Sequence, residues 1–167
     1  MKNIIFLLMI LFLSNNIANA EVKDSDVAAL FDQWNKALQT QDPATVTALY
    51  ADDAILLPTV SNVVRSGHEL IKDYFVDFLK LKPQGRIVER FIDTINDNTV
   101  ADNGVYEFTL IKNGKAEEVM ARYSFIYKKV NGKWVILVHH SSLMPESSES
   151  KYRWYNLGHW LRLLTSD

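Results

Sequence analysis

Hydrophobic residues recur at helical spacing in the first third of the chain. After Asp24-Ser25-Asp26, which can cap a helix, apolar residues lie three and four positions apart from Val27 to Leu38. Asp42-Pro43 starts a short second helix, with Asp as the cap and Pro in the first turn, and we expect this helix to reach about Tyr50. Asp52-Asp53 then reads as a turn or cap.

A third helix is indicated by Ser66 and Glu69, which have capping-box spacing. Its broad apolar stripe continues to Leu79, and Pro83 closes it. Arg65, just before the cap, reads as a solvated loop residue. The pattern therefore predicts three amphipathic helices in the first half of the chain.

After Arg86 the pattern changes to alternation, which is typical of strands. It predicts strands at 86–95, 100–111, 117–129 and 134–142. Asn113-Gly114 and Asn131-Gly132 favour two-residue hairpin turns, because both residue types tolerate positive φ. We therefore expect an α+β fold, with three N-terminal helices packed on the aromatic face of a curved antiparallel sheet.

The last predicted strand is apolar on both faces from Trp134 to Val138. One face can pack on the helices, and the other needs a further cover, either the C-terminal tail or a second subunit. We therefore expect a homodimer or larger homo-oligomer formed through the sheet face, with Val135 and Leu137 towards the partner. Unbroken alternation places five residues on the helix side: Trp134, Ile136, Val138, His140 and Ser142.

The two ends of the chain differ from its middle. Residues 1–20 combine Lys2, an apolar run and the small-x-small motif Ala18-Asn19-Ala20, which is typical of a secretory signal peptide. The apolar run, Ile4 to Leu13, is shorter than the roughly 20 residues of a membrane-spanning helix, although a retained N-terminal anchor is the alternative. We expect a periplasmic or secreted domain at 21–146, without stable membrane insertion after signal cleavage. Residues 147–167 read as a polar break followed by an amphipathic helical tail. This tail either packs on the protein or contacts a membrane surface, and the sequence leaves both alternatives open.

Composition and motifs narrow the possible functions. The formal net charge is −2, and it becomes −3 when Lys2 is removed with residues 1–20, so no electrostatic case exists for binding nucleic acid. The chain has no cysteine, no Gly-rich phosphate loop, no nucleophile elbow and no metalloprotease motif. His139 and His140 are neighbours on a strand and point to opposite faces, which argues against a paired metal site. We expect no cofactor and no metal.

An ordered set of residues resembles a known superfamily. The chain is similar to the nuclear transport factor 2-like proteins, in particular to the calcium/calmodulin-dependent protein kinase II association domain. The shared features, in order, are Asp42, Pro58, Gly67, Tyr74-Phe75, Gly132-Lys133-Trp134, His140, Ser142 and Pro145. The chain also resembles SgcJ/EcaC-type (SnoaL-like) stand-alone bacterial proteins, in the Arg-Tyr-x-Phe-x-Tyr strand from Arg122 and the His-His-Ser-Ser-x-Met-Pro ending from His139.

The resemblance implies a cone-shaped fold with His140 inside an internal pocket. The kinase association domain has arginines in its pocket, and at one of those positions this chain has Phe125, which implies a less cationic pocket. The kinase label describes the ancestry of the fold rather than a kinase activity.

Two functions of different class follow from these features. The first is an exported, non-catalytic oligomerising domain whose cone binds a small apolar or weakly anionic molecule. Its expected lining is Trp34, Tyr50, Tyr74, Phe78, Tyr106, Phe125, His140 and Ser142.

The second function is a cofactor-free enzyme, isomerase- or dehydratase-like, that transfers a proton or removes water. His140 or Asp53 would be the base, and a pocket tyrosine such as Tyr74 would stabilise the oxyanion. A carboxylate bonded to the histidine would favour the enzyme. An aromatic pocket whose histidine bonds only to backbone would favour binding.

Overall fold

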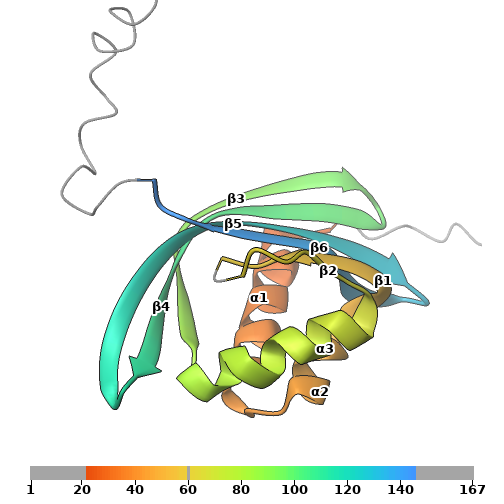
Figure 1. The fold of residues 1–167 in the computed structure, drawn as a ribbon. Helices are drawn as coiled ribbons and strands as arrows, with labels where there is room; N and C mark the ends of the chain where they lie inside the picture. Colours follow the sequence, from red (N-terminus) through yellow and green to blue (C-terminus); the bar gives the residue numbers. More distant parts are fainter. Residues whose placement is uncertain (1–21, 60, 146–167) are drawn as a thin grey trace, which may run out of the picture.

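The structure is a computed structural model that describes residues 22–59 and 61–145 (Figure 1). The predicted signal peptide and C-terminal tail lie outside these residues. The elements, in order, are α1 (Asp24–Gln39), α2 (Pro43–Thr47), β1 (Tyr50–Leu57), β2 (Arg65–Ser66), α3 (Gly67–Phe78), the 3-10 turn η1 (Leu79–Leu81), β3 (Gln84–Asn96), β4 (Thr99–Lys112), β5 (Lys115–Val130) and β6 (Lys133–Leu143). None of the helices in the described ranges is long and apolar enough to cross a membrane.

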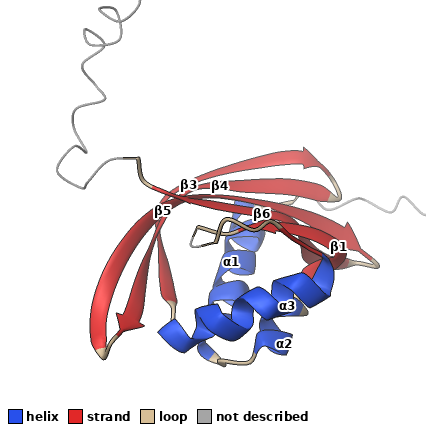
Figure 2. Ribbon diagram, in the orientation of Figure 1, coloured by secondary structure: helices blue, strands red, loops and turns tan. Residues whose placement is uncertain are grey.

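The six strands form one curved sheet in the order β2-β1-β6-β5-β4-β3. The four predicted strands correspond to β3 to β6, which form an antiparallel meander. Both predicted hairpin turns are confirmed, because φ is positive at Asn113 and Gly114 (51° and 75°) and at Asn131 and Gly132 (50° and 79°). Figure 2 shows the helices gathered on the concave side of the sheet, which confirms the α+β architecture.

The predicted end of the second helix is wrong. The helix stops at Thr47, and the chain enters β1 at Tyr50, so Asp52 and Asp53 lie exposed on a strand and not in a turn. Strand β1 pairs in parallel with β6, which makes the sheet mixed and not purely antiparallel. This pairing joins segments distant in sequence, and the local pattern carries no sign of it.

The two predicted helix caps differ in outcome. The Asp42 side chain accepts hydrogen bonds from the backbone N–H groups of Ala44 and Thr45, as expected of a cap. Ser66 occupies the cap position of α3 but makes no capping hydrogen bond, so the predicted capping box is absent.

Strand β6 contains a bulge that changes which residues face the helices. Tyr127 pairs with Ile136 and the adjacent Ile126 pairs with Val138, so Leu137 is an extra residue on β6. An extra residue exchanges the two faces for everything beyond it. His139 is therefore buried on the concave face, and His140 is exposed on the other. The predicted placement of Val138, His140 and Ser142 towards the helices is wrong, while that of Ile136 is confirmed.

Aromatic residues fill the space between the helices and the sheet. Phe31 and Trp34 of α1 are buried against the inward-facing rings of β4 and β5. The ring centroids of Trp34 and Phe125 are 5.4 Å apart, in an edge-to-face arrangement. The predicted cover of the aromatic sheet face by the helices is confirmed.

Candidate functional site

An apolar cavity of about 40 Å³ lies between the concave face of the sheet and the helices. Its walls come from α1, α3, the end of β1 and the segment after it, and strands β4, β5 and β6. The lining residues are Trp34, Leu56, Pro58, Thr59, Tyr74, Phe75, Phe78, Tyr106, Phe108, Leu110, Val119, Ala121, His139 and Ser141.

The polar centre of this cavity is His139. The Trp34 indole N–H donates to the Tyr50 hydroxyl at 3.1 Å, and that hydroxyl lies 2.9 Å from His139 Nδ1. Phe125 stacks on the imidazole, with ring centroids 4.1 Å apart. Among the described residues, His139 Nε2 is buried and has no hydrogen-bond partner.

This network determines which imidazole nitrogen carries the proton. An indole N–H can only donate, so the Tyr50 oxygen accepts from Trp34. We assign the single Tyr50 hydrogen to His139 Nδ1, because an Nδ1–H donating to Tyr50 would leave that hydrogen without an acceptor among the described residues. Nδ1 is then the acceptor and Nε2 carries the proton. Burial lowers the pKa of His139 to about 3, with a smaller contribution from neighbouring His140, so the ring is neutral near pH 7.

A cluster of hydroxyl groups forms a second polar part of the lining. The Tyr106 hydroxyl donates to Ser141 Oγ, and Ser141 Oγ also shares a hydrogen bond with Thr59 Oγ1. These groups bond one another, whereas the Nε2–H of His139 has no acceptor in the described chain. A buried donor without a partner is costly, and it is satisfied when water or a ligand supplies an acceptor.

The structure brings together part of the predicted lining. Of the eight predicted residues, Trp34, Tyr74, Phe78 and Tyr106 line the cavity. Tyr50 and Phe125 lie behind the lining and contact the His139 ring. His140 is exposed and Ser142 pairs with exposed Arg122, so both lie on the outer face.

The three predicted catalytic residues are not together. Tyr74 lines the cavity, and burial raises the pKa of its hydroxyl above the ordinary value. Asp53 is exposed on β1, and His140 is exposed on the convex face of β6. The predicted pairing of His140 with a pocket tyrosine is therefore wrong, for the same reason that its face was wrong: the bulge at Leu137.

Sequence reasoning missed His139, Ser141 and Thr59. Alternation from Trp134 assigned His139 and Ser141 to the outer face, and the bulge reversed that assignment. The neighbouring pair His139-His140 did signal that one histidine faces inward, but not which one.

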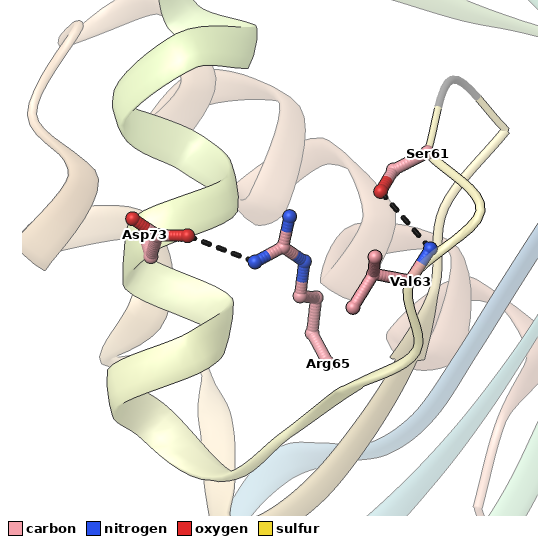
Figure 3. Close-up of polar contacts among 4 residues, drawn as sticks. All are labelled: Ser61, Val63, Arg65 and Asp73. Atoms are coloured by element: carbon pink, nitrogen blue, oxygen red, sulfur yellow. Dashed lines mark hydrogen bonds and ion pairs between the residues drawn. The ribbon is translucent and has the colours of Figure 1, made fainter.

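Arg65 is not the solvated loop residue that the sequence indicated. It begins β2, its side chain is 18% exposed, and its Nη1 lies 2.8 Å from Asp73 Oδ2 on α3 (Figure 3). Figure 3 also shows the Ser61 hydroxyl accepting from the Val63 N–H in the preceding loop. The Arg65 charge, which acts to lower the pKa of Tyr74, is thus paired with a carboxylate.

The concave face also holds a buried carboxylate, Asp102 on β4. It accepts from the Tyr123 hydroxyl at 2.9 Å and from Arg90 Nε at 3.1 Å, and its other oxygen has no partner among the described residues. Burial raises the pKa of Asp102, although Tyr123 and Arg90 act in the opposite direction. In the strand register Phe125 lies between Asp102 and His139, so the carboxylate pairs with Arg90 and not with the histidine.

The described residues contain no cluster of three or more His, Cys, Asp or Glu side chains that could hold a metal ion.

Comparison with known families agrees with this geometry. Residues 23–145 match the family model of the calcium/calmodulin dependent protein kinase II association domain. The chain belongs to this association domain family. None of the curated proteins compared with it matches.

Solved structures share the association domain fold. A protein from Xanthomonas campestris described as such an association domain is 53% identical, with a TM-score of 0.74 over 77% of this chain and 92% of that one. The association domain of the C. elegans kinase is 19% identical, with a TM-score of 0.60 over 71% of this chain and 93% of that one. An NTF2-like (nuclear transport factor 2-like) protein with a cystatin-like fold, from Novosphingobium aromaticivorans, is 10% identical, with a TM-score of 0.62 over 76% of this chain and 85% of that one. The last two likenesses concern the fold alone.

Proposed function

We propose that this protein is an exported, non-catalytic association domain that self-associates and binds a small, largely apolar molecule in its concave cavity. The observation that carries the proposal is the buried Nε2 of His139, which has no hydrogen-bond partner among the described residues and lies in an apolar lining. Pockets of this composition, with one or two placed polar groups, are typical of ligand sites.

Binding is favoured over catalysis by the state of His139. With a pKa of about 3, the imidazole does not accept a proton near neutral pH, as a general base would have to do. Its hydrogen-bond partner is Tyr50, and the nearby carboxylate of Asp102 is bonded to Arg90 and Tyr123. The histidine thus lacks the carboxylate partner that would favour an enzyme.

Self-association is supported by the convex side of the sheet and by the family. Ile126 pairs with Val138, which pairs with Ile55 on the next strand, and none of these three apolar side chains is fully buried. A partner that covers this row would remove more apolar surface from water. Export is supported by the signal-like pattern of residues 1–20.

Native mass spectrometry of the protein purified without residues 1–20 tests ligand binding and assembly together. We expect a dimer or larger species with a small molecule retained on each subunit. Substitution of His139 by leucine should abolish retention of the molecule without changing the subunit count. Wild-type protein that carries no small molecule under gentle ionisation and also binds no added apolar ligand would contradict the ligand-binding part of the proposal.

Introducing a charge into the convex row should dissociate the assembly. Val138→Lys places an ammonium group where Ile126 and Ile55 would meet the partner. Leaving a charge unpaired in an interface costs about 3 kcal/mol or more, which weakens association by at least about a hundredfold. Sedimentation velocity measures the change.

Val63→Lys is the matched control, because Val63 is 55% exposed in the loop before β2, away from the convex row. It should leave the sedimentation coefficient unchanged. A wild-type protein that sediments as a monomer at micromolar concentration would contradict self-association.

A further inference from the structure

We propose that the cavity selects an electrically neutral ligand with a carbonyl-type hydrogen-bond acceptor, which receives the Nε2–H of His139, and that Tyr50 sets this selectivity. The inference rests on the proposed ligand-binding function and narrows it to a chemical class. It replaces the broader expectation of an apolar or weakly anionic ligand.

The cavity lining carries no formal charge. None of the described lining residues is Lys, Arg, Asp or Glu, and His139 is neutral. A carboxylate that enters such a lining loses its hydration and meets neutral donors only, which is costly. A carbonyl oxygen loses much less hydration and still accepts one hydrogen bond.

Two cations near the site, Arg65 and Arg90, each have a carboxylate partner, although Arg65 Nε and Arg90 Nη2 have no hydrogen-bond partner among the described residues. Arg65, which acts on Tyr74 at the cavity wall, forms an ion pair with Asp73 at 2.8 Å. Arg90 bonds to Asp102 through Nε at 3.1 Å. Neither guanidinium lines the cavity, so neither supplies the charge that would hold a carboxylate there.

Tyr50 determines that the cavity offers a donor and not an acceptor. Its hydroxyl accepts from Trp34 and gives its hydrogen to Nδ1 of His139, which leaves the proton of the imidazole on Nε2. Tyr50 is not part of the lining, whereas His139 is, so Nε2 is the ring nitrogen available to a ligand. Tyr50 acts through His139 and is a positioning residue.

The volume limits which part of the ligand enters. A dry cavity that binds benzene has about 150 Å³, and this cavity has about 40 Å³. A small polar head fits beside His139, and the apolar body of the ligand lies at the wall formed by half-buried Tyr74, Phe78 and Val119.

Two probes of equal chain length test the selectivity, heptyl methyl ketone and nonanoate. Isothermal titration of the wild-type protein at neutral pH should show the ketone binding at least about tenfold more tightly, because both probes accept the Nε2–H but only the carboxylate must lose the hydration of a charge. Nitrogen NMR of labelled histidine should show the His139 proton on Nε2 before binding and a shifted Nε2–H resonance in the ketone complex. Neither measurement depends on a variant that must fold.

Tyr50→Phe tests the positioning role. Without the hydroxyl, Nδ1 loses its donor, so the imidazole should also populate the form with the proton on Nδ1. The ketone affinity should fall about tenfold, which is the value of one hydrogen bond, and any weak nonanoate binding should fall as well, because its carboxylate accepts from the same donor. His140→Gln is the matched control, since His140 is exposed on the other face and should leave both affinities unchanged.

Nonanoate binding as tightly as the ketone, or an imidazole protonated on Nδ1 in the wild-type protein, would overturn the inference. Binding of neither probe would also overturn this ligand class. A small molecule retained in native mass spectrometry would in that case leave the proposed function standing. Absence of a retained molecule, combined with tight ketone binding, would contradict only the idea that the ligand is carried through purification.

Discussion

Gly104→Ala is expected to destabilise the protein more than any other substitution of a glycine that we consider. A Cβ at this position would lie 2.0 Å from the backbone oxygen of Glu89 and 2.8 Å from its carbonyl carbon. Both atoms belong to the backbone of β3, so no side-chain rotation relieves the clash. The φ angle of Gly104, 155°, is also one that residues with a side chain rarely adopt.

The expected loss is more than about 4 kcal/mol of unfolding free energy, in the range that marks exceptional substitutions. Urea titration followed by circular dichroism measures it. Because β4 also carries Tyr106, whose hydroxyl bonds to Ser141 in the cavity, any variant that folds should show a disturbed cavity.

Gly114→Ala is the control for this prediction. Gly114 also has a positive φ, 75°, but a Cβ there meets no atom within 4 Å. Its loss should be only about 1–2 kcal/mol, the cost of left-handed backbone for a residue with a side chain. Equal losses at Gly104 and Gly114 would show that the close approach of β3 carries no energetic weight.

Elements with local signals could be predicted from the sequence. The apolar stripe and Asp42 cap gave two helices, and the Asn-Gly pairs gave two hairpins with their register. These features depend on residues within a few positions of one another, where side-chain periodicity and turn chemistry act directly.

Features that depend on distant segments could not be predicted. Strand β1 exists because its residues pair with β6, with Leu56 opposite His139, far along the chain. The Arg65–Asp73 ion pair requires β2 to lie beside α3. Nothing in the local pattern of either segment records its partner.

The bulge at Leu137 shows how one residue decides the site. The five residues from Trp134 to Val138 are all apolar, so they do not indicate which of them face the helices. A one-residue shift of register in this stretch therefore cannot be recognised from the sequence. Because of this shift, the histidine at the cavity is His139 and not the predicted His140. His139 is buried and neutral, whereas His140 is exposed. The chemistry of the site was therefore set by pairing geometry and not by residue type.

Acidification is expected to destabilise the protein through His139. An unfolded histidine has a pKa of about 6.5, and burial lowers the pKa of His139 in the folded state to about 3. Between these values the unfolded state binds one more proton than the folded state, so the unfolding free energy falls as the pH falls. The slope is about 1.4 kcal/mol per pH unit. The contribution of His139 is complete above about pH 6.5 and is lost as the pH approaches 3.

Paired substitutions separate this effect from the general titration of carboxylates. His139→Gln retains a polar side chain near Tyr50 but cannot be protonated, so its stability should depend less steeply on pH below neutrality than that of the wild type. His140→Gln removes the exposed neighbour and should retain most of the wild-type slope, although His140 lowers the pKa of His139 slightly. Urea unfolding at a series of pH values measures all three proteins. If His139→Gln and the wild type lost stability in parallel, the folded and unfolded states would protonate His139 alike, which would contradict the lowered pKa of the buried imidazole.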